Sequence, residues 1–157
     1  MAKLSLTRRD LFLAALVGTA TLGVARPSLA KDPNYFADFW GNAIRGYDPV
    51  AYFTEGKAVE GSEDLELDWD GATWRFASAE NLAAFKADPT KYAPQFGGYC
   101  AWAVSQGYTA SIDPEAWDIV NGKLYLNYST GIQKKWQQNR DANIAAGERN
   151  WPAALGS

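Results

Sequence analysis

The sequence predicts an α+β domain in which hairpin–helix units, potentially duplicated, pack on a small antiparallel sheet. Three observations support this fold class. Residues 65–69 alternate between apolar and acidic side chains, as a strand with one buried face does. A turn-forming pair, Asp70-Gly71, follows this strand directly, and a return strand leads to a serine that can cap a helix. A weaker copy of the same order recurs 51 positions later.

The first thirty residues read as a targeting segment and do not enter the fold. Residues 7–13 (TRRDLFL) resemble a twin-arginine motif, an apolar run extends from Leu11 to Val24, and Ser28-Leu29-Ala30 forms a small-x-small cleavage site. The sequence therefore predicts a twin-arginine signal peptide over 1–30 and a single mature domain over 31–157, in the periplasm or another extracytoplasmic compartment. The apolar run has 14 residues, whereas a spanning helix needs roughly 20. We expect no stable membrane insertion after cleavage.

The mature chain is acidic. The leader holds four of the 15 basic residues and one of the 18 acidic residues, which leaves 11 basic and 17 acidic residues and a net charge of −6. Such a charge excludes nucleic acid as a partner, because phosphates attract basic surfaces. It also argues against binding to anionic membranes. A single cysteine cannot form an internal disulfide, so packing must stabilise the domain.

The N-terminal part of the mature chain contains two short predicted elements. Residues 34–44 are rich in aromatic side chains and predict a short helix or an arm. Asp48-Pro49 is a turn signal, and the apolar Val50–Phe53 after it reads as a short strand.

The hairpin and its helix follow. The spacing predicts antiparallel strands at about 65–69 and 73–77, and a helix over 79–87 with Ser78 as its N-cap. Asp88-Pro89 ends this helix. The predicted core consists of large apolar side chains on one face of each element: Leu67, Trp69, Trp74, Phe76, Leu82, Phe85 and Trp136.

The later copy predicts a second strand–helix unit over 117–146. Its helix should run from about Thr130 to Ala146 and pack a narrow face on the sheet. The equivalent positions align without a gap: Asp70-Gly71 with Asn121-Gly122, Trp74 with Tyr125, Ser78 with Ser129, and Phe85 with Trp136. Few of these residues are identical, so an internal duplication and two independent hairpin–helix units both explain the pattern.

The absence of histidine excludes several kinds of site. A Ser-His-Asp triad, a Cys-His pair and a two-histidine zinc motif all require imidazole. Ser105 therefore reads as a hydroxyl at a helix end. The acidic residues from Glu63 to Asp70 resemble the first half of a calcium loop, but Ala77 stands where such a loop needs glutamate. This run reads as the solvated face of a strand.

The one cysteine, Cys100, is the candidate functional residue. Gly97-Gly98 followed by Tyr99, Cys100 and Trp102 predicts a short helix with the thiol in its first turn. A thiol at that place is favoured as thiolate by the helix dipole. The alternative is an inert small side chain in a packed surface, because free cysteine is among the most buried residue types.

Three segments, GYDPVAYF, WRFASAENLAAFKADPTKYAPQ and FGGYCAWAVSQG, together resemble the YHS domain family, in particular its exported single-domain branch with a twin-arginine leader. Such domains are small α+β units, several of them associated with copper or other soft metals. Metal-binding members tend to carry cysteines after Asp-Pro-Val and after the second strand, where this chain has Ala51 and Ala77. The exported branch instead carries the GGYCA segment. Some of its members are regarded as selenoproteins, which by resemblance favours a reactive group at Cys100.

Two functions follow. In the first, Cys100 is the metal ligand for copper or another soft ion, with Tyr99, Trp102, Gly97 and Gly98 around the bound ion. In the second, Cys100 is a redox residue that cycles through a sulfenic acid or a mixed disulfide with a small thiol. Binding is favoured over catalysis, and a CxxC redox cycle is excluded because no second cysteine is present.

Overall fold

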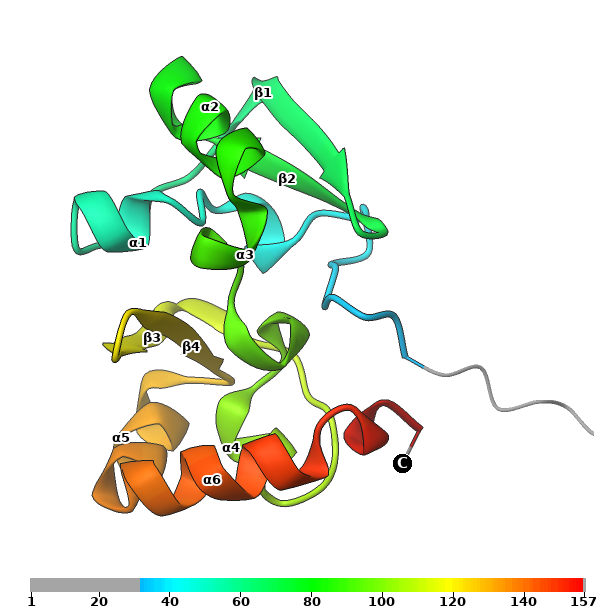
Figure 1. Ribbon diagram of the computed structural model, residues 1–157, viewed down its shortest axis with the longest axis vertical. Coiled ribbons are helices and arrows are strands. Elements are labelled where there is room, and N and C mark those ends of the chain that lie inside the picture. The colour runs from blue at the N-terminus through cyan, green and yellow to red at the C-terminus, as the bar shows by residue number, and fades with distance from the viewer. Residues whose placement is uncertain (1–31, 157) are drawn as a thin grey trace, which may run out of the picture.

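The computed structural model describes residues 32–156 (Figure 1). The α+β class is confirmed, with two small antiparallel sheets in place of the single sheet expected. The predicted signal peptide over 1–30 lies outside the described residues. Within residues 32–156, no helix is both long enough and apolar enough to cross a membrane.

The first unit occupies the upper half of Figure 1. Its strands and helices, in chain order, are α1 (Ala51–Thr54), β1 (Ser62–Trp69), β2 (Ala72–Phe76), α2 (Ala79–Ala87) and α3 (Pro89–Tyr92). The hairpin and α2 agree with the prediction because their signals are local. Ser78 accepts a hydrogen bond from the Asn81 N–H and caps α2, and Asp88 caps α3, which has proline at its start.

The second unit occupies the lower half of the same view. It consists of α4 (Ala101–Ser105), β3 (Asp113–Val120), β4 (Lys123–Asn127), α5 (Thr130–Gln138) and α6 (Arg140–Asn150). The prediction of one helix over 130–146 is wrong. Asn139, with φ −134° and ψ 47°, ends α5 and precedes α6.

The two hairpin–helix units have matching lengths. Adding 51 to the first and last residue numbers of β1, β2 and α2 gives the first and last residue numbers of β3, β4 and α5. The strand registers also match, and in both hairpins a bulge follows the first residue of the first strand, Ser62 or Asp113. Both turns have a non-glycine residue with positive φ, Asp70 or Asn121, followed by glycine.

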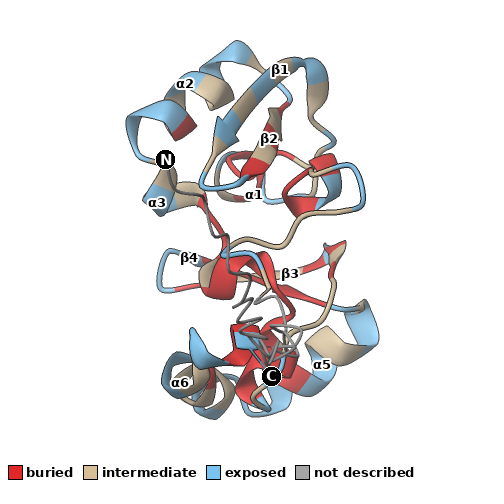
Figure 2. Ribbon diagram, turned by 90° about the vertical axis from the view of Figure 1, so that its right-hand side faces the viewer, coloured by how far each residue is buried: buried red, intermediate tan, exposed pale blue. Residues whose placement is uncertain are grey.

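Large rings fill the core of the first unit. Trp74, Phe76 and Phe85 are buried, and the Phe85 ring contacts both others with ring centroids about 5 Å apart. Trp69 packs against Trp74 and Phe85 from the edge of this cluster and is only partly buried. Leu67 and Leu82 are also partly buried, so these three of the seven predicted core residues lie at its margin. Trp136 is fully buried in the second unit, against Tyr125. Figure 2 shows buried segments gathered near β4 and between the two halves.

The prediction of a strand over Val50–Phe53 is wrong, because these residues are the start and body of α1. The apolar composition suggested a strand, whereas the deciding contact comes from Asp48, whose Oδ1 accepts the Val50 N–H at 2.8 Å and the Ala51 N–H at 3.3 Å. These bonds satisfy the free N–H groups of the first helical turn.

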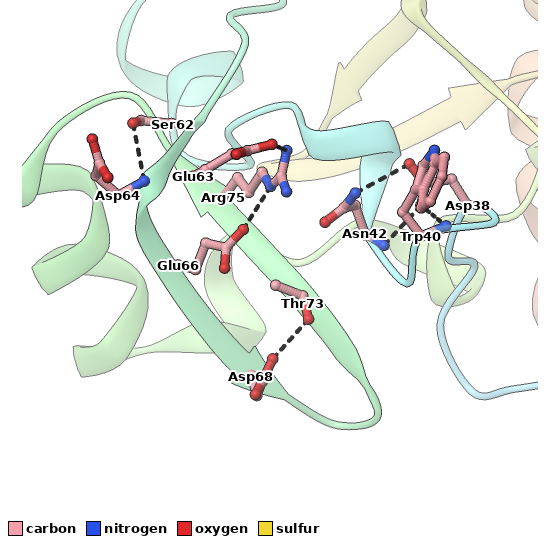
Figure 3. Close-up of polar contacts among 10 residues, drawn as sticks. All are labelled: Asp38, Trp40, Asn42, Ser62, Glu63, Asp64, Glu66, Asp68, Thr73 and Arg75. Carbon is pink, nitrogen blue, oxygen red and sulfur yellow. Dashed lines mark hydrogen bonds and ion pairs between the residues drawn. The ribbon is translucent and has the colours of Figure 1, made fainter.

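Residues 32–43 form an arm that contacts both units. Near its start, Asp32 N–H donates to Leu155 O and Phe36 N–H donates to Gly97 O. Further along, Thr73 N–H donates to Gly41 O and Ala43 N–H donates to Thr73 O, which attaches the arm to β2. Asp38 accepts the N–H groups of Trp40 and Asn42 in a tight loop (Figure 3).

Candidate functional site

The chain enters the site through a left-handed turn. Phe96, Gly97 and Gly98 have φ of 53°, 59° and 72°. A Cβ on Gly97 would lie 2.0 Å from the Asn34 carbonyl oxygen, and one on Gly98 would lie 2.9 Å from Pro94 Cγ. Glycine is therefore required by both backbone conformation and space. The turn fixes the direction in which Cys100 leaves the backbone.

Cys100 is the N-cap residue of α4 and only 1% exposed. Its Sγ accepts the Tyr128 N–H at 3.3 Å. The thiol donates in turn to Asn127 Oδ1 at a Sγ–Oδ1 distance of 3.8 Å, within the range for a weak sulfur hydrogen bond. The sulfur thereby connects the start of α4 to Asn127 and Tyr128, which lie 27 and 28 residues further along the chain.

Burial raises the pKa of the Cys100 thiol above its ordinary value. The backbone N–H groups of Ala103, Tyr128 and Trp102 act in the opposite direction and favour thiolate, but burial has the larger effect. The expectation that the helix dipole makes thiolate the favoured form of Cys100 is therefore wrong. The dipole argument considered α4 alone, whereas β4 and the segment after it cover the sulfur.

A cavity of about 240 Å³ borders the thiol. Tyr108 and Tyr128, which are 42% and 57% exposed, stand on its outer side. The Lys135 ammonium lies 4.3 Å from the centroid of the Trp102 ring, which also borders the cavity. The complete lining consists mainly of apolar and aromatic side chains: Cys100, Trp102, Ala103, Tyr108, Ala110, Tyr128 and Ile132. The thiol is therefore buried, but it borders a cavity whose outer side carries exposed side chains.

The structure separates the residues expected around Cys100. Trp102 lines the cavity beside the thiol. Tyr99 does not line it, because its hydroxyl donates to the Pro33 carbonyl at 2.7 Å and its ring packs against Phe36. Gly97 and Gly98 shape the turn and also lie outside the cavity lining.

Sequence reasoning missed Asn127 and Tyr128. Asn127 is fully buried, and its Oδ1 accepts the Trp102 N–H at 3.2 Å in addition to the thiol. A signal for it exists in the internal repeat. The equivalent position of the first unit is Phe76, so a polar residue replaces a core ring there. A buried polar substitution of this kind indicates a specific partner.

Comparison with known proteins gives one match. Residues 50–96 match the YHS domain family. No curated protein and no solved structure matches the chain. The matched residues comprise α1, the first hairpin, α2 and α3, so the resemblance is supported for the first unit. The match ends four residues before Cys100.

YHS domains are associated with metal binding, and the structure allows the donor set to be tested. The backbone N–H groups of Ala51 and Ala77 both donate to Asp48, so the two expected cysteine positions lie beside the same carboxylate. Both are alanines here and offer no ligand. Among residues 32–156, no three histidine, cysteine, aspartate or glutamate side chains are grouped as metal ligands.

The groups around Cys100 also differ from a metal site. N–H groups turn positive hydrogens toward the sulfur, and the side-chain oxygen bonded to it, Asn127 Oδ1, is engaged by the Trp102 N–H. This arrangement suits a negative charge on sulfur better than a cation beside it. The described residues do not fit a metal centre with several ligands from this chain.

Two other sequence interpretations are confirmed by contacts. Arg75 pairs with Glu66 at 2.8 Å and with Glu63 at 3.2 Å, while Asp68 accepts the Thr73 hydroxyl at 2.7 Å (Figure 3). The acidic run is thus the solvated face of β1. Ser105 donates its hydroxyl to the Trp102 carbonyl at 2.6 Å, within its own helix.

Proposed function

We propose that this protein is an exported YHS-like module whose functional centre is Cys100, acting as a single thiol in redox chemistry with a peroxide or a small thiol. The observation that carries the proposal is the Tyr128 N–H, which donates to a sulfur that borders a cavity; the N–H groups of Ala103 and Trp102 also favour thiolate. A cysteine used only for packing has no need of such donors. The cavity gives a small oxidant its route to the sulfur.

The raised pKa defines the kinetics of this thiol. Thiolate is the reactive form, so reaction should be slow at neutral pH and accelerate as the pH rises. Such behaviour fits a guarded redox residue rather than a fast peroxidase.

Soft-metal capture is the second candidate function, and the YHS match favours it. Because Ala51 and Ala77 carry no ligand atoms, the metal would be copper(I) or a similar ion bound by Cys100 with one further ligand from outside the chain. Metal binding of that form would require the thiol to lose its proton.

Alkylation and oxidation of the purified mature protein test the two candidates. The rate of Cys100 alkylation by iodoacetamide should rise with pH and have its midpoint above about 8.5, the value for a free cysteine. Peroxide should yield a sulfenic acid trapped by dimedone. Absence of both reactions in the folded protein across the alkaline range would contradict the redox proposal. Protection from alkylation by anaerobic copper(I), with one ion per chain, would favour the metal candidate.

Matched variants test whether the cavity is the route. Ile132→Trp adds bulk to the cavity lining and should slow oxidation at least tenfold. Ala142→Trp, on the exposed side of α6, is the control and should leave the rate unchanged. Equal slowing in both variants would show that the reagent reaches Cys100 by another route.

Export rests on the leader alone. Replacing Arg8 and Arg9 by lysine should leave uncleaved precursor in the cytoplasm, because the twin-arginine pair is the routing signal. A mature N-terminus near Lys31 in the wild type would support cleavage at the predicted site. Unaltered export of the double-lysine variant would contradict the twin-arginine route.

A further inference from the structure

The first unit contains a buried carboxylate that is held by four donors. Asp48 is fully buried. Its Oδ1 accepts the N–H groups of Val50 and Ala51, two and three residues further along the chain. Its Oδ2 accepts the Ala77 N–H at 2.8 Å and the Asn81 Nδ2 at 2.7 Å. Hydrogen bonds to each oxygen allow an anion to be buried there without a cation.

Cys100 stands at the same place in the second unit. Asp48 and Cys100 each follow a Gly-Tyr pair whose glycine has positive φ, 83° for Gly46 and 72° for Gly98. Each precedes a short helix, α1 or α4. Each also meets the N–H of the residue directly after the second strand of its hairpin, which is Ala77 or Tyr128.

The other donors correspond as well. Asp48 receives N–H groups from positions two and three residues ahead, and for Cys100 the same positions are Trp102 and Ala103. Of the four donors around the Asp48 carboxylate, the Ala77 N–H thus has a counterpart bonded to the sulfur, and two more have counterparts at the same positions in the following helix. The fourth, Asn81, is replaced by Ile132 in the repeat.

An independent observation supplies the missing donor. Asn127 is fully buried and its amide faces the sulfur, with Oδ1 3.8 Å from Sγ. Its Nδ2 has no hydrogen-bond partner within residues 32–156. An unpaired buried amide N–H is costly. The same amide group bears the Oδ1 that contacts the sulfur, so an acceptor atom added on the sulfur would have this donor close by.

We propose that Cys100 is a modification site, at which oxidation to a sulfinate produces an anion held as the Asp48 carboxylate is held. This inference rests on the proposed redox function and names its stable oxidised state. A sulfinate carries two oxygens on the atom attached to Cβ, as aspartate does. Its oxygens can accept the N–H groups of Tyr128 and Ala103 and the unpaired Nδ2 of Asn127.

The oxidation proceeds in two balanced steps with peroxide as oxidant. In the first, the sulfur attacks one peroxide oxygen, an S–O bond forms as the O–O bond breaks, and water leaves; sulfur loses two electrons and peroxide gains them. In the second, the sulfenic acid reacts with another peroxide in the same way and releases water and a proton to solvent. Peroxide is small enough to enter from the cavity beside Cys100.

Mass spectrometry of the folded protein under increasing peroxide tests the end state. The Cys100 peptide should gain about 32 Da, corresponding to two oxygens, and stop there, whereas unfolded protein should continue to the three-oxygen sulfonate. Progress to sulfonate in the folded protein at the same rate would overturn the inference. Arrest at a sulfenic acid or mixed disulfide would overturn it and leave the redox function standing. Absence of any oxidation would overturn both.

A substitution pair tests the anion site without oxidation. Cys100→Asp places a carboxylate at the position that corresponds to Asp48 in the first unit. Cys100→Asn is the control, with the same shape but no charge. The Asp variant should fold and have the higher urea midpoint at pH 7, and its advantage should disappear as the pH falls and the carboxyl is protonated. An Asn variant more stable than the Asp variant, or an Asp variant that alone fails to fold, would overturn the inference.

Asn127 provides a further readout in the wild-type cysteine background. Asn127→Leu removes the unpaired donor while keeping the site filled. Peroxide-treated wild-type protein should keep or raise its urea midpoint relative to reduced protein, whereas the Leu variant should lose stability on oxidation. Equal responses of the two proteins would show that the amide has no part in holding the oxidised sulfur.

Discussion

The two hairpin–helix units have the same backbone but different residues at their centres. Strand lengths, turn, bulge and helix cap coincide at a constant offset of 51 positions. In the first unit a ring cluster surrounds Phe76 and a carboxylate caps α1; in the second, Asn127 and Cys100 stand at the corresponding places. The two units share their turns, caps and the buried rings at Phe85 and Trp136 while these central residues differ. With the same backbone, the buried centre changes from a ring and a carboxylate to an asparagine and a cysteine.

The largest expected effect concerns the equivalent core positions Phe85 and Trp136, both fully buried. Phe85→Ala and Trp136→Ala should each lower the free energy of unfolding by about 3–5 kcal/mol, because each leaves a cavity in a packed core. Urea denaturation followed by tryptophan fluorescence and by circular dichroism measures this. Coincident transitions from both probes would show that the two units unfold together.

A loss below about 1 kcal/mol for either variant would place that ring at the surface, contrary to the structure. Separate transitions for the two halves would instead sharpen the comparison, since each unit would then count as an independent folding element.

The second effect contrasts the two capping residues. Asp48→Ala removes the acceptor of four hydrogen bonds and should cost about 3 kcal/mol, since buried donors to a charged group are left unpaired. Cys100→Ala removes a weaker acceptor and should cost about 1 kcal/mol. The same urea experiment compares them. Equal losses would mean that the two caps contribute alike and that the charge on Asp48 is irrelevant.

The third effect concerns two glycines with positive φ. Gly97→Ala should destabilise by about 2 kcal/mol or more, because the new Cβ meets the Asn34 carbonyl in addition to straining the backbone. Gly122→Ala is the matched control, with φ of 74° but open space around it, and should cost about 1 kcal/mol. If thermal unfolding shows no difference between them, the arm does not approach Gly97 closely in solution.

The smallest effect is the dependence of stability on alkaline pH. Burial raises the pKa of Tyr99 to about 12, and burial also raises that of Cys100. Because their pKa values are lower in the unfolded chain, both groups lose their protons there first. Their contribution to the free energy of unfolding is therefore complete below the ordinary pKa values and is lost as the pH rises through the pKa values of the folded state. The urea midpoint should therefore fall progressively above about pH 9. Tyr99→Phe should show a shallower decline between about pH 10 and 12.

Local signals in the sequence predict the first hairpin and its helix well. Asp70-Gly71, Ser78 and Asp88-Pro89 specify a turn, a start and a stop without reference to the rest of the chain, and α2 has the predicted bounds. Prediction from local signals fails where a contact with a distant residue determines the local structure. Val50–Phe53 is helical because Asp48 caps it and is buried against Ala77, 29 residues away.

The same limit applies to the candidate site. Cys100 is identifiable as the one thiol, and its place before a short helix follows from Gly97-Gly98. Its burial does not follow, because β4 and Tyr128 reach it from 28 residues further along the chain. The sign of its pKa shift depends on that cover, so local reasoning from α4 gives the wrong direction.

The arm described above has a consequence for the order of events during synthesis. Asp32, at the beginning of the described chain, donates its N–H to the carbonyl of Leu155, near the very end. The Pro33 carbonyl accepts from Tyr99, and the arm then continues to β2 of the first unit. Leu155 must therefore be synthesised before Asp32 can take its final position. The arm reaches its place only after the second unit is made, however early the first hairpin forms.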